Sequence, residues 1–215
     1  MLSIDHAFIC CAQGAPEARA LLELGLVEGS GNRHPGQGTA NRRFFFSNAY
    51  LELLWVSNED EARSPEALDT RLWQRWSQRC DTSCPFGLLF RSDESPLPFA
   101  TWSHKPRYLP AGTSLEFASG VPMTEPELAL IASARPAPPP REPIEHRVPI
   151  RRISKVEVFL PTTGPLSKPA AALHESGVVT FKTGADYALE LGFASEQPLR
   201  FDLRPVLPLV FRSFP

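Results

Sequence analysis

The sequence has no apolar run of about 18 residues and no large excess of charge of either sign. Lys and Arg together number 22 and Asp and Glu 24, which gives a net charge of −2. We therefore expect no membrane-spanning helix and no strong attraction to nucleic acid or to an anionic membrane. The N-terminal stretch MLSIDHAFICC also lacks the basic region, apolar run and cleavage site of a signal peptide. These features predict a cytoplasmic protein with neither nucleic acid nor membrane as a partner.

Cysteine is scarce and lacks the spacing of a metal or disulfide framework. The four cysteines are Cys10, Cys11, Cys80 and Cys84. Adjacent cysteines on a strand point to opposite faces, and a single C-x3-C is not a zinc ribbon. We expect reduced thiols that act as small buried apolar side chains.

Several catalytic fingerprints are also missing. The loop RHPGQGTAN, residues 33–41, contains Gly36 and Gly38 but not the spacing of a dinucleotide or phosphate-binding loop. The sequence has no G-x-S-x-G nucleophile elbow. We therefore expect no nucleotide or flavin cofactor and no serine-hydrolase chemistry.

The chain is long enough for a substantial core, and its prolines mark where elements end. It has 215 residues, 42% hydrophobic, and 23 prolines. The segment RPAPPPREP, residues 135–143, predicts an extended linker that spans about 136–150. A linking helix is predicted over 64–80, with Ser64 as its N-cap and Pro65 at its first position.

The first part of the chain predicts a β-α-β-β-β module over residues 1–57. Apolar alternation and helical spacing give a strand, a helix closed by Gly25, a Gly-rich strand or loop, and two more strands. These lie at 3–11, 16–25, 26–38, 41–47 and 49–56.

The same order of elements returns later in the chain. A C-terminal module over 151–215 is predicted with a strand, a helix and three strands at 153–160, 165–176, 178–182, 186–194 and 199–205. Residues 84–135 form a degenerate copy with strands at 85–91 and 113–119, while 127–133 could be strand or helix. The whole predicts an α+β fold of repeated β-α-β-β-β modules, with curved, mostly antiparallel mixed sheets around a cleft.

The stretches IDHAFIC, HPGQGTANRRFFFSNAYLELLWV, PRYLP, TEPEL and ISKVEVFLP resemble the glyoxalase-like proteins of the vicinal oxygen chelate superfamily. The resemblance implies paired β-α-β-β-β modules that enclose a cleft, often with a divalent metal such as Mn, Fe, Ni or Zn. It places His6 on the first strand and Glu52 on the last strand of module one, as metal ligands and catalytic groups. An imidazole and a carboxylate that converge from neighbouring strands suit such ions.

The second half departs from the pattern of the resembled family. The strand PFGLLFR offers no His, Asp or Glu, and Glu127 matches the remaining metal-ligand position only loosely. In the C-terminal module, Lys155 stands in the place of His6 and Asp202 in the place of Glu52.

Two loops offer further candidates for substrate binding. The first would present His34, Thr39 and Asn41 at the cleft mouth; alternatively, Thr39 and Asn41 satisfy their own backbone in a tight connection. The second, SHKPRYLPAG, would present Arg107 and Tyr108 to a carboxylate or enolate, or else form an exposed surface loop.

Two functions remain open from the sequence. The first is an enzyme in which a divalent metal chelates vicinal oxygens of a small-molecule substrate, of lyase, isomerase or dioxygenase type. The alternative is a metal-free protein that binds or sequesters a small molecule, of the bleomycin-resistance type. A homodimer is possible in either case, because paired modules can be completed by a second chain.

Overall fold

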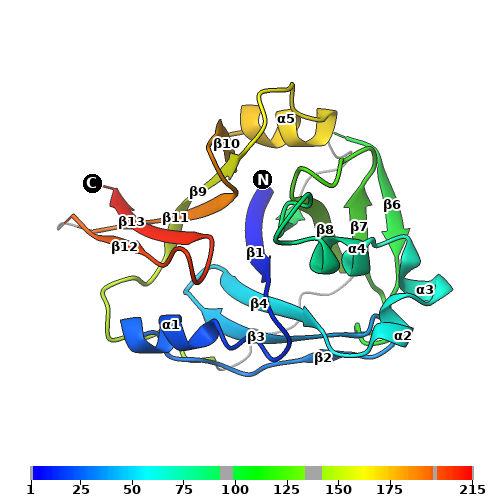
Figure 1. Ribbon diagram of the computed structural model, residues 1–215, viewed down its shortest axis with the longest axis horizontal. Coiled ribbons are helices and arrows are strands. Elements are labelled where there is room, and N and C mark those ends of the chain that lie inside the picture. The colour runs from blue at the N-terminus through cyan, green and yellow to red at the C-terminus, as the bar shows by residue number, and fades with distance from the viewer. Residues whose placement is uncertain (1, 93–98, 134–141, 196–197, 215) are drawn as a thin grey trace.

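The computed structural model describes residues 2–92, 99–133, 142–195 and 198–214, which form two mixed β-sheets with short helices (Figure 1). The elements in chain order are β1 (Leu2–Cys10), α1 (Ala18–Leu24), β2 (Arg33–His34), β3 (Thr39–Phe45), β4 (Tyr50–Val56), α2 (Glu59–Ala62), α3 (Pro65–Leu68), α4 (Leu72–Ser77), β5 (Phe86–Ser92), β6 (Thr101–His104), β7 (Thr113–Ala118), β8 (Glu127–Ser133), β9 (Ile153–Leu160), α5 (Lys168–Glu175), β10 (Thr180–Thr183), β11 (Ala188–Ala194), β12 (Arg200–Asp202) and β13 (Leu209–Phe214). The predicted α+β class with curved mixed sheets is confirmed. No helix in these ranges is long and apolar enough to cross a membrane.

The larger sheet has eight strands in the order β2-β3-β4-β1-β5-β8-β7-β6. Its two halves follow one plan: β1 runs parallel to β4 and β5 runs parallel to β8, while the remaining neighbours are antiparallel. The halves join where β1 pairs with β5. The segment 127–133, which the sequence left open between strand and helix, is therefore a strand.

The first half is the β-α-β-β-β unit that its sequence predicts. Alternation along β1 places Ala7 and Ile9 in the main core, while Phe8 belongs to a second apolar cluster on the other face. Helix α1 ends at Gly25, whose φ of 106° is left-handed, and a Cβ there would lie 3.0 Å from the Arg147 side chain.

The linking helix predicted over 64–80 is broken in the structure. Helix α3 ends at Leu68 and α4 starts at Leu72. Arg71, between them, has a left-handed φ of 54°. The hydroxyl of Thr70 donates to the carbonyl of Ala67, 2.6 Å away, which closes the first helix locally. A side chain–backbone hydrogen bond therefore wins over helical periodicity here.

The smaller sheet has five strands in the order β10-β9-β11-β13-β12. Its pairings repeat those of the inner strands β4-β1-β5-β8-β7: parallel, antiparallel, parallel, antiparallel. The order along the chain agrees as well, so this sheet is a copy of the first with its outer strands removed. The sequence predicted three strands after α5 and missed the fourth, β13. Its stretch LPLVFRSF follows several prolines and could equally be an irregular tail.

One hydrophobic core joins the two sheets and the helices α1 and α5. Ile9 and Leu51 of the larger sheet belong to the same buried cluster as Val158, Leu191 and Phe211 of the smaller one. The opposite face of the larger sheet carries its own cluster, which includes Phe8, Leu54, Leu72, Leu89, Leu115 and Phe117. This second face forms the cleft.

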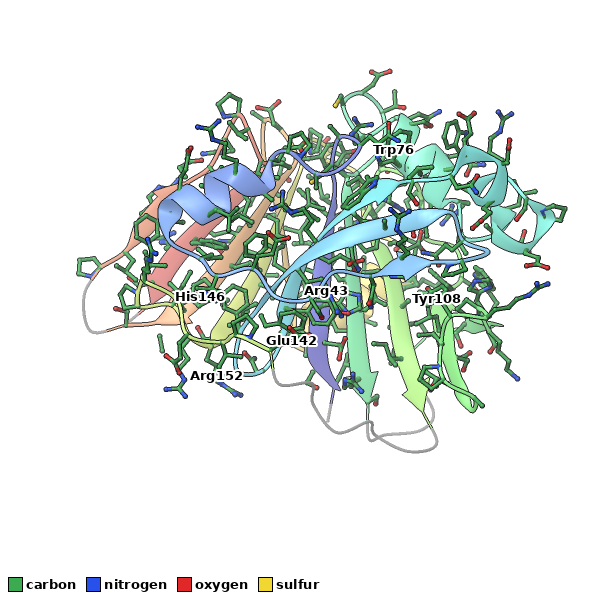
Figure 2. The ribbon with its side chains drawn as sticks, turned by 90° about the horizontal axis from the view of Figure 1, so that it is seen from below. Arg43, Trp76, Tyr108, Glu142, His146 and Arg152 are labelled. Carbon is green, nitrogen blue, oxygen red and sulfur yellow. The ribbon has the colours of Figure 1, made fainter. Side chains whose placement is uncertain are left out.

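The segment that leads into β9 lies against the first module. Residues 136–141 of the predicted linker lie outside the described residues, but the rest of it, 142–150, lies against the first module (Figure 2). The backbone N–H and the hydroxyl of Ser30 both donate to Glu142, and the His146 ring lies 3.0 Å from the carbonyl oxygen of Phe45. The connection is therefore hydrogen-bonded to the sheet that forms the cleft.

Candidate functional site

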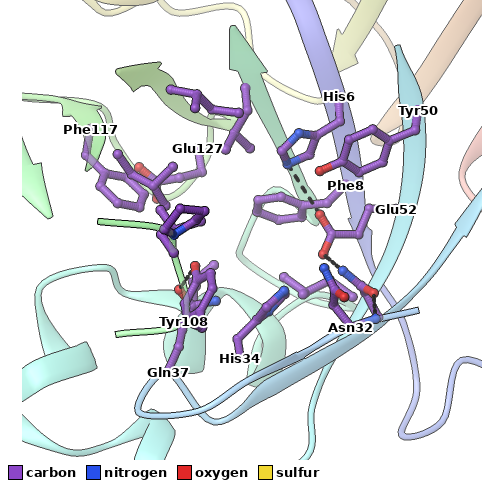
Figure 3. Close-up of a pocket in the computed structure, with 18 residues that line it drawn as sticks. His6, Phe8, Asn32, His34, Gln37, Tyr50, Glu52, Tyr108, Phe117 and Glu127 are labelled. Atoms are coloured by element: carbon purple, nitrogen blue, oxygen red, sulfur yellow. Dashed lines mark hydrogen bonds and ion pairs between the residues drawn. The ribbon is translucent and has the colours of Figure 1, made fainter. Parts of the chain in front are cut away.

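The cleft of the eight-stranded sheet contains a cavity of about 260 Å³ that is lined by polar and apolar side chains (Figure 3). Its polar end is formed by His6, Asn32, Asn41 and Glu52, and His34 and Gln37 also line the cavity. The apolar wall includes Phe8, Leu54, Leu72, Leu89, Leu115 and Phe117. Such a cavity, apolar with a few convergent polar groups, is the usual form of a small-molecule site.

His6 and Glu52 meet because β1 and β4 are parallel neighbours. Phe8 is paired with Glu52 in the register, so His6, two residues before Phe8, lies on the same face of the sheet as Glu52. Nε2 of His6 lies 3.4 Å from Oε2 of Glu52, and both residues are buried. The two predicted residues are thus brought together in the cleft.

Asn41 holds the other oxygen of Glu52. Its amide Nδ2 donates to Oε1 over 2.6 Å, and its own Oδ1 accepts from the backbone N–H of Asn32 over 2.6 Å. A buried carboxylate needs such a donor to offset the water it has lost. Asn41, predicted as a ligand contact or as a turn residue, therefore orients Glu52.

Asp5 contacts His6 on the side away from Glu52. The β1–β5 register shifts between Ile4 and His6, so Asp5 is an extra residue in a β-bulge. Its Oδ1 lies 2.6 Å from Nδ1 of His6, and its Oδ2 accepts from Nε of Arg91. Burial alone would raise the pKa of Asp5, but the hydrogen bond to His6, together with Arg91, holds that pKa below its usual value. Asp5 is therefore a carboxylate at neutral pH.

Aromatic rings and a glycine fix the floor of the cleft. The Tyr50 ring stacks on His6 with centroids 4.3 Å apart and an interplanar angle of 15°. Burial, with a smaller contribution from the Glu52 carboxylate, raises the pKa of Tyr50 well above its usual value. Gly87 pairs with Phe8, and a Cβ on Gly87 would lie 2.0 Å from the Phe8 ring. Only glycine leaves room for that ring.

The mouth of the cleft is built from the loop before β3 and the loop after β6. His34 Nδ1 lies 2.8 Å from the hydroxyl oxygen of Thr39, which also accepts from Nε2 of Gln37. The hydroxyl of Tyr108 donates to Oε1 of Gln37 over 2.8 Å, and its ring lies 4.6 Å from that of His34. Burial lowers the pKa of His34 and raises that of Tyr108. The predicted residues His34 and Tyr108 line the cavity, whereas Thr39 does not line it but contacts His34.

Glu127 and Arg107 are engaged elsewhere. Glu127 lines the cavity, but its Oε2 lies 3.3 Å from Nη2 of the fully buried Arg75 and 3.9 Å from Nη2 of Arg71. Burial nonetheless raises the pKa of Glu127. Arg107 does not line the cavity; it pairs with Glu66 at 2.6 Å on the surface.

The donor set does not fit a metal site with three protein ligands. Within the described ranges, no group of three or more His, Cys, Asp or Glu side chains is placed to hold an ion. Leu89 faces His6 from β5, and Glu127 on β8 is bound to Arg75. A ligand set of His6, Glu52 and Glu127 stays a prediction, and it would require Glu127 to leave Arg75. In the C-terminal module predicted over 151–215, Lys155 pairs with Glu157 and Asp202 with Arg204.

Sequence reasoning missed Asp5, Asn32 and Gln37. Adjacent strand residues normally point to opposite faces, so Asp5 beside His6 is visible only once the bulge is known. The backbone N–H of Asn32 donates to Oδ1 of Asn41, and a backbone contact of this kind has no sequence signal. Gln37 lies between Gly36 and Gly38, and its isolation in that loop is the one hint that it has a role.

Part of the chain is similar to a known protein family. Residues 4–97 match the family model described as glyoxalase-like domain. A crystal structure of a hypothetical protein from Staphylococcus aureus is 11% identical, covers 100% of both chains and has a TM-score of 0.53, which shows a shared fold. A hypothetical protein from Bacillus halodurans C-125 is 12% identical with a TM-score of 0.42, over 64% of this chain and 99% of that one. No curated protein matches the chain. Residues 4–97 are therefore similar to the glyoxalase-like domain, which agrees with the resemblance found in the sequence.

Proposed function

We propose that the cleft binds a small amphipathic molecule without the help of a metal ion. The observation that supports this most directly is a buried imidazole and a buried carboxylate, 3.4 Å apart, at the polar end of an otherwise apolar cavity. The polar end fixes the orientation of a ligand, and the leucine and phenylalanine wall takes its apolar part.

Metal-independent binding is favoured by the chemistry of the opposite wall. The strands β5 and β8 present Leu89 and Ile131 to the cavity, and Glu127 is neutralised by Arg75. Catalytic metal sites usually have three protein ligands. A metal-dependent lyase, isomerase or dioxygenase stays a prediction, and it would need a donor beyond His6 and Glu52.

The first experiment measures both metal content and ligand binding. Protein purified without chelator is analysed for Mn, Fe, Ni and Zn, and then screened by thermal denaturation against small neutral, cationic and anionic compounds. We expect less than stoichiometric metal and at least one compound that raises the melting temperature.

A cavity-filling variant shows whether such a compound binds in the cleft. Leu115 lines the cavity, so Leu115→Trp should abolish the thermal shift while the protein stays folded. The exposed Val206→Ala variant should keep the full shift. Stoichiometric metal that is lost in both His6→Ala and Glu52→Ala would instead favour the enzyme and overturn this proposal.

A further inference from the structure

We infer that the polar group of the ligand is an amine, held as an ammonium between Oε2 of Glu52 and Nε2 of His6. The inference rests on the proposed function, because it assumes a ligand in this cleft. It follows from which hydrogen-bonding positions of the two side chains are already used and from how the cations near the cleft are paired.

The Nδ1 position of His6 is already engaged. Asp5 is a carboxylate and can only accept a hydrogen bond, so Nδ1 of His6, 2.6 Å from Oδ1, carries the proton between them. Arg91 holds the second oxygen of Asp5, and the stacked Tyr50 ring restrains the imidazole plane. In a neutral imidazole with its proton on Nδ1, Nε2 is an acceptor.

Glu52 presents a second acceptor to the same point. Its Oε1 accepts from Asn41, and its Oε2 lies 3.4 Å from Nε2 of His6. Two acceptors that face each other need a donor. An ammonium group brings three N–H donors and can bind both acceptors at once.

The cations near the cleft do not line the cavity. No Lys or Arg is among the described residues that line it. Arg75 pairs with Glu127, Arg91 with Asp5 and Arg107 with Glu66. A carboxylate or phosphate group on the ligand would therefore find no cation to pair with and would lie beside the Glu52 carboxylate.

The rest of the cavity suits the apolar body of such an amine. The rings of Phe8, Tyr108 and Phe117 line it together with Leu89 and Leu115. Aromatic faces attract a cation and also pack against an apolar chain or ring. A primary amine that carries one ring on a short chain combines the two requirements.

Three probes with one skeleton test the head group. Wild-type protein in the presence of a chelator is titrated calorimetrically at pH 7.5 with 3-phenylpropylamine, 3-phenylpropan-1-ol and 3-phenylpropionate. A hydrogen bond to a charged group contributes enough to expect about tenfold tighter binding of the amine than of the alcohol, with the carboxylate weakest.

Variants locate the effect at Glu52. Glu52→Gln should bring the amine to the affinity of the alcohol and leave the alcohol itself within about twofold, because the charge alone is removed. Glu190→Gln removes a buried carboxylate from the smaller sheet and should keep the full preference for the amine. The comparison of probes on the wild type stands even if Glu52→Gln fails to fold.

Other outcomes would contradict the inference in distinguishable ways. If the amine and the alcohol bind equally, or if the carboxylate binds most tightly, the inference that the ligand is an amine is overturned. The proposed binding function then stands. If Zn²⁺ alone, without chelator, binds wild type and not His6→Ala, the acceptor pair belongs to a metal and the amine is overturned. If none of the three probes binds at millimolar concentration and no compound in the wider screen raises the melting temperature, both the binding function and the amine head group are contradicted.

Discussion

Oδ1 of Asp5 and Nδ1 of His6 lie 2.6 Å apart, although the two residues are consecutive on a β-strand. A regular strand would point them to opposite faces. The bulge in β1 removes that alternation at one position and gives the cleft imidazole a fixed partner on its far side. The orientation of His6 therefore depends on a backbone irregularity.

Removal of the Asp5 carboxylate should remove the constraint on which ring nitrogen of His6 carries the proton. In wild type, ¹⁵N NMR of the imidazole should show the proton on Nδ1, because Asp5 accepts from it. Asp5→Leu should give a mixture of tautomers. Glu157→Gln removes a buried strand carboxylate from the smaller sheet and should leave the His6 signals unchanged. Identical spectra for wild type and Asp5→Leu would show that Asp5 does not set the tautomer.

Loss of the Asn41 amide should destabilise the protein through Glu52. Asn41→Leu leaves Oε1 of a buried carboxylate without its donor, which costs about 1–3 kcal/mol of unfolding free energy. Urea denaturation measures the change. In the double variant with Glu52→Leu, no carboxylate remains to be left unsatisfied. The loss of unfolding free energy in the double variant should therefore be smaller than the sum of the losses in the two single variants. Strict additivity would mean that the two side chains are not coupled.

Acidification should weaken the fold in part through His34. Burial lowers its pKa from 6.5, and the nearby Glu52 carboxylate offsets this only partly. In the unfolded chain His34 binds a proton near pH 6.5, whereas in the folded chain it binds one only at lower pH. The unfolding free energy therefore falls as the pH drops below about 6.5. His34→Gln should lose less stability than wild type between about pH 7.5 and 5.5 in urea denaturation.

The matched control for that measurement is Asn32→Gln, a substitution of a neighbouring cavity residue that does not titrate. It should keep the wild-type pH dependence. An unchanged pH dependence in His34→Gln would assign the acid sensitivity to other groups, such as His104 and His146, whose pKa values burial also lowers.

A cavity in the smaller sheet should destabilise the larger one. Leu191→Ala removes a fully buried side chain from the shared core and should cost about 2–5 kcal/mol. The four tryptophans, Trp55, Trp73, Trp76 and Trp102, all lie in the first half of the chain, so their fluorescence reports on the larger sheet and its helices. The fluorescence and circular dichroism midpoints should fall together.

The exposed substitution Val206→Ala serves as the control for the core variant, with a change expected within about 0.5 kcal/mol. A circular dichroism midpoint that falls while the tryptophan midpoint stays in place would mean that the two sheets unfold independently.

Most of the strands could be predicted from sequence because they depend on local periodicity. Alternation groups His6 with Phe8 and Glu52 with Tyr50, but the resemblance to the glyoxalase-like proteins was needed to place His6 and Glu52 in one cleft. The features that the sequence did not predict depend on contacts between residues distant in sequence. Glu127 is bound to Arg75, 52 residues away, and no sequence pattern indicates that pair. The break between α3 and α4 depends on the left-handed Arg71, a conformation that helical spacing does not reveal.

The strand order of the smaller sheet changes how the chain is counted. Each of the parallel pairs β1–β4, β5–β8, β9–β10 and β11–β13 corresponds to one module, so the chain holds four modules where periodicity suggested three. They join two by two, β1 to β5 and β9 to β11. Every module thus finds its mate inside one polypeptide, and neither sheet requires an exchanged strand from a second molecule for its completion.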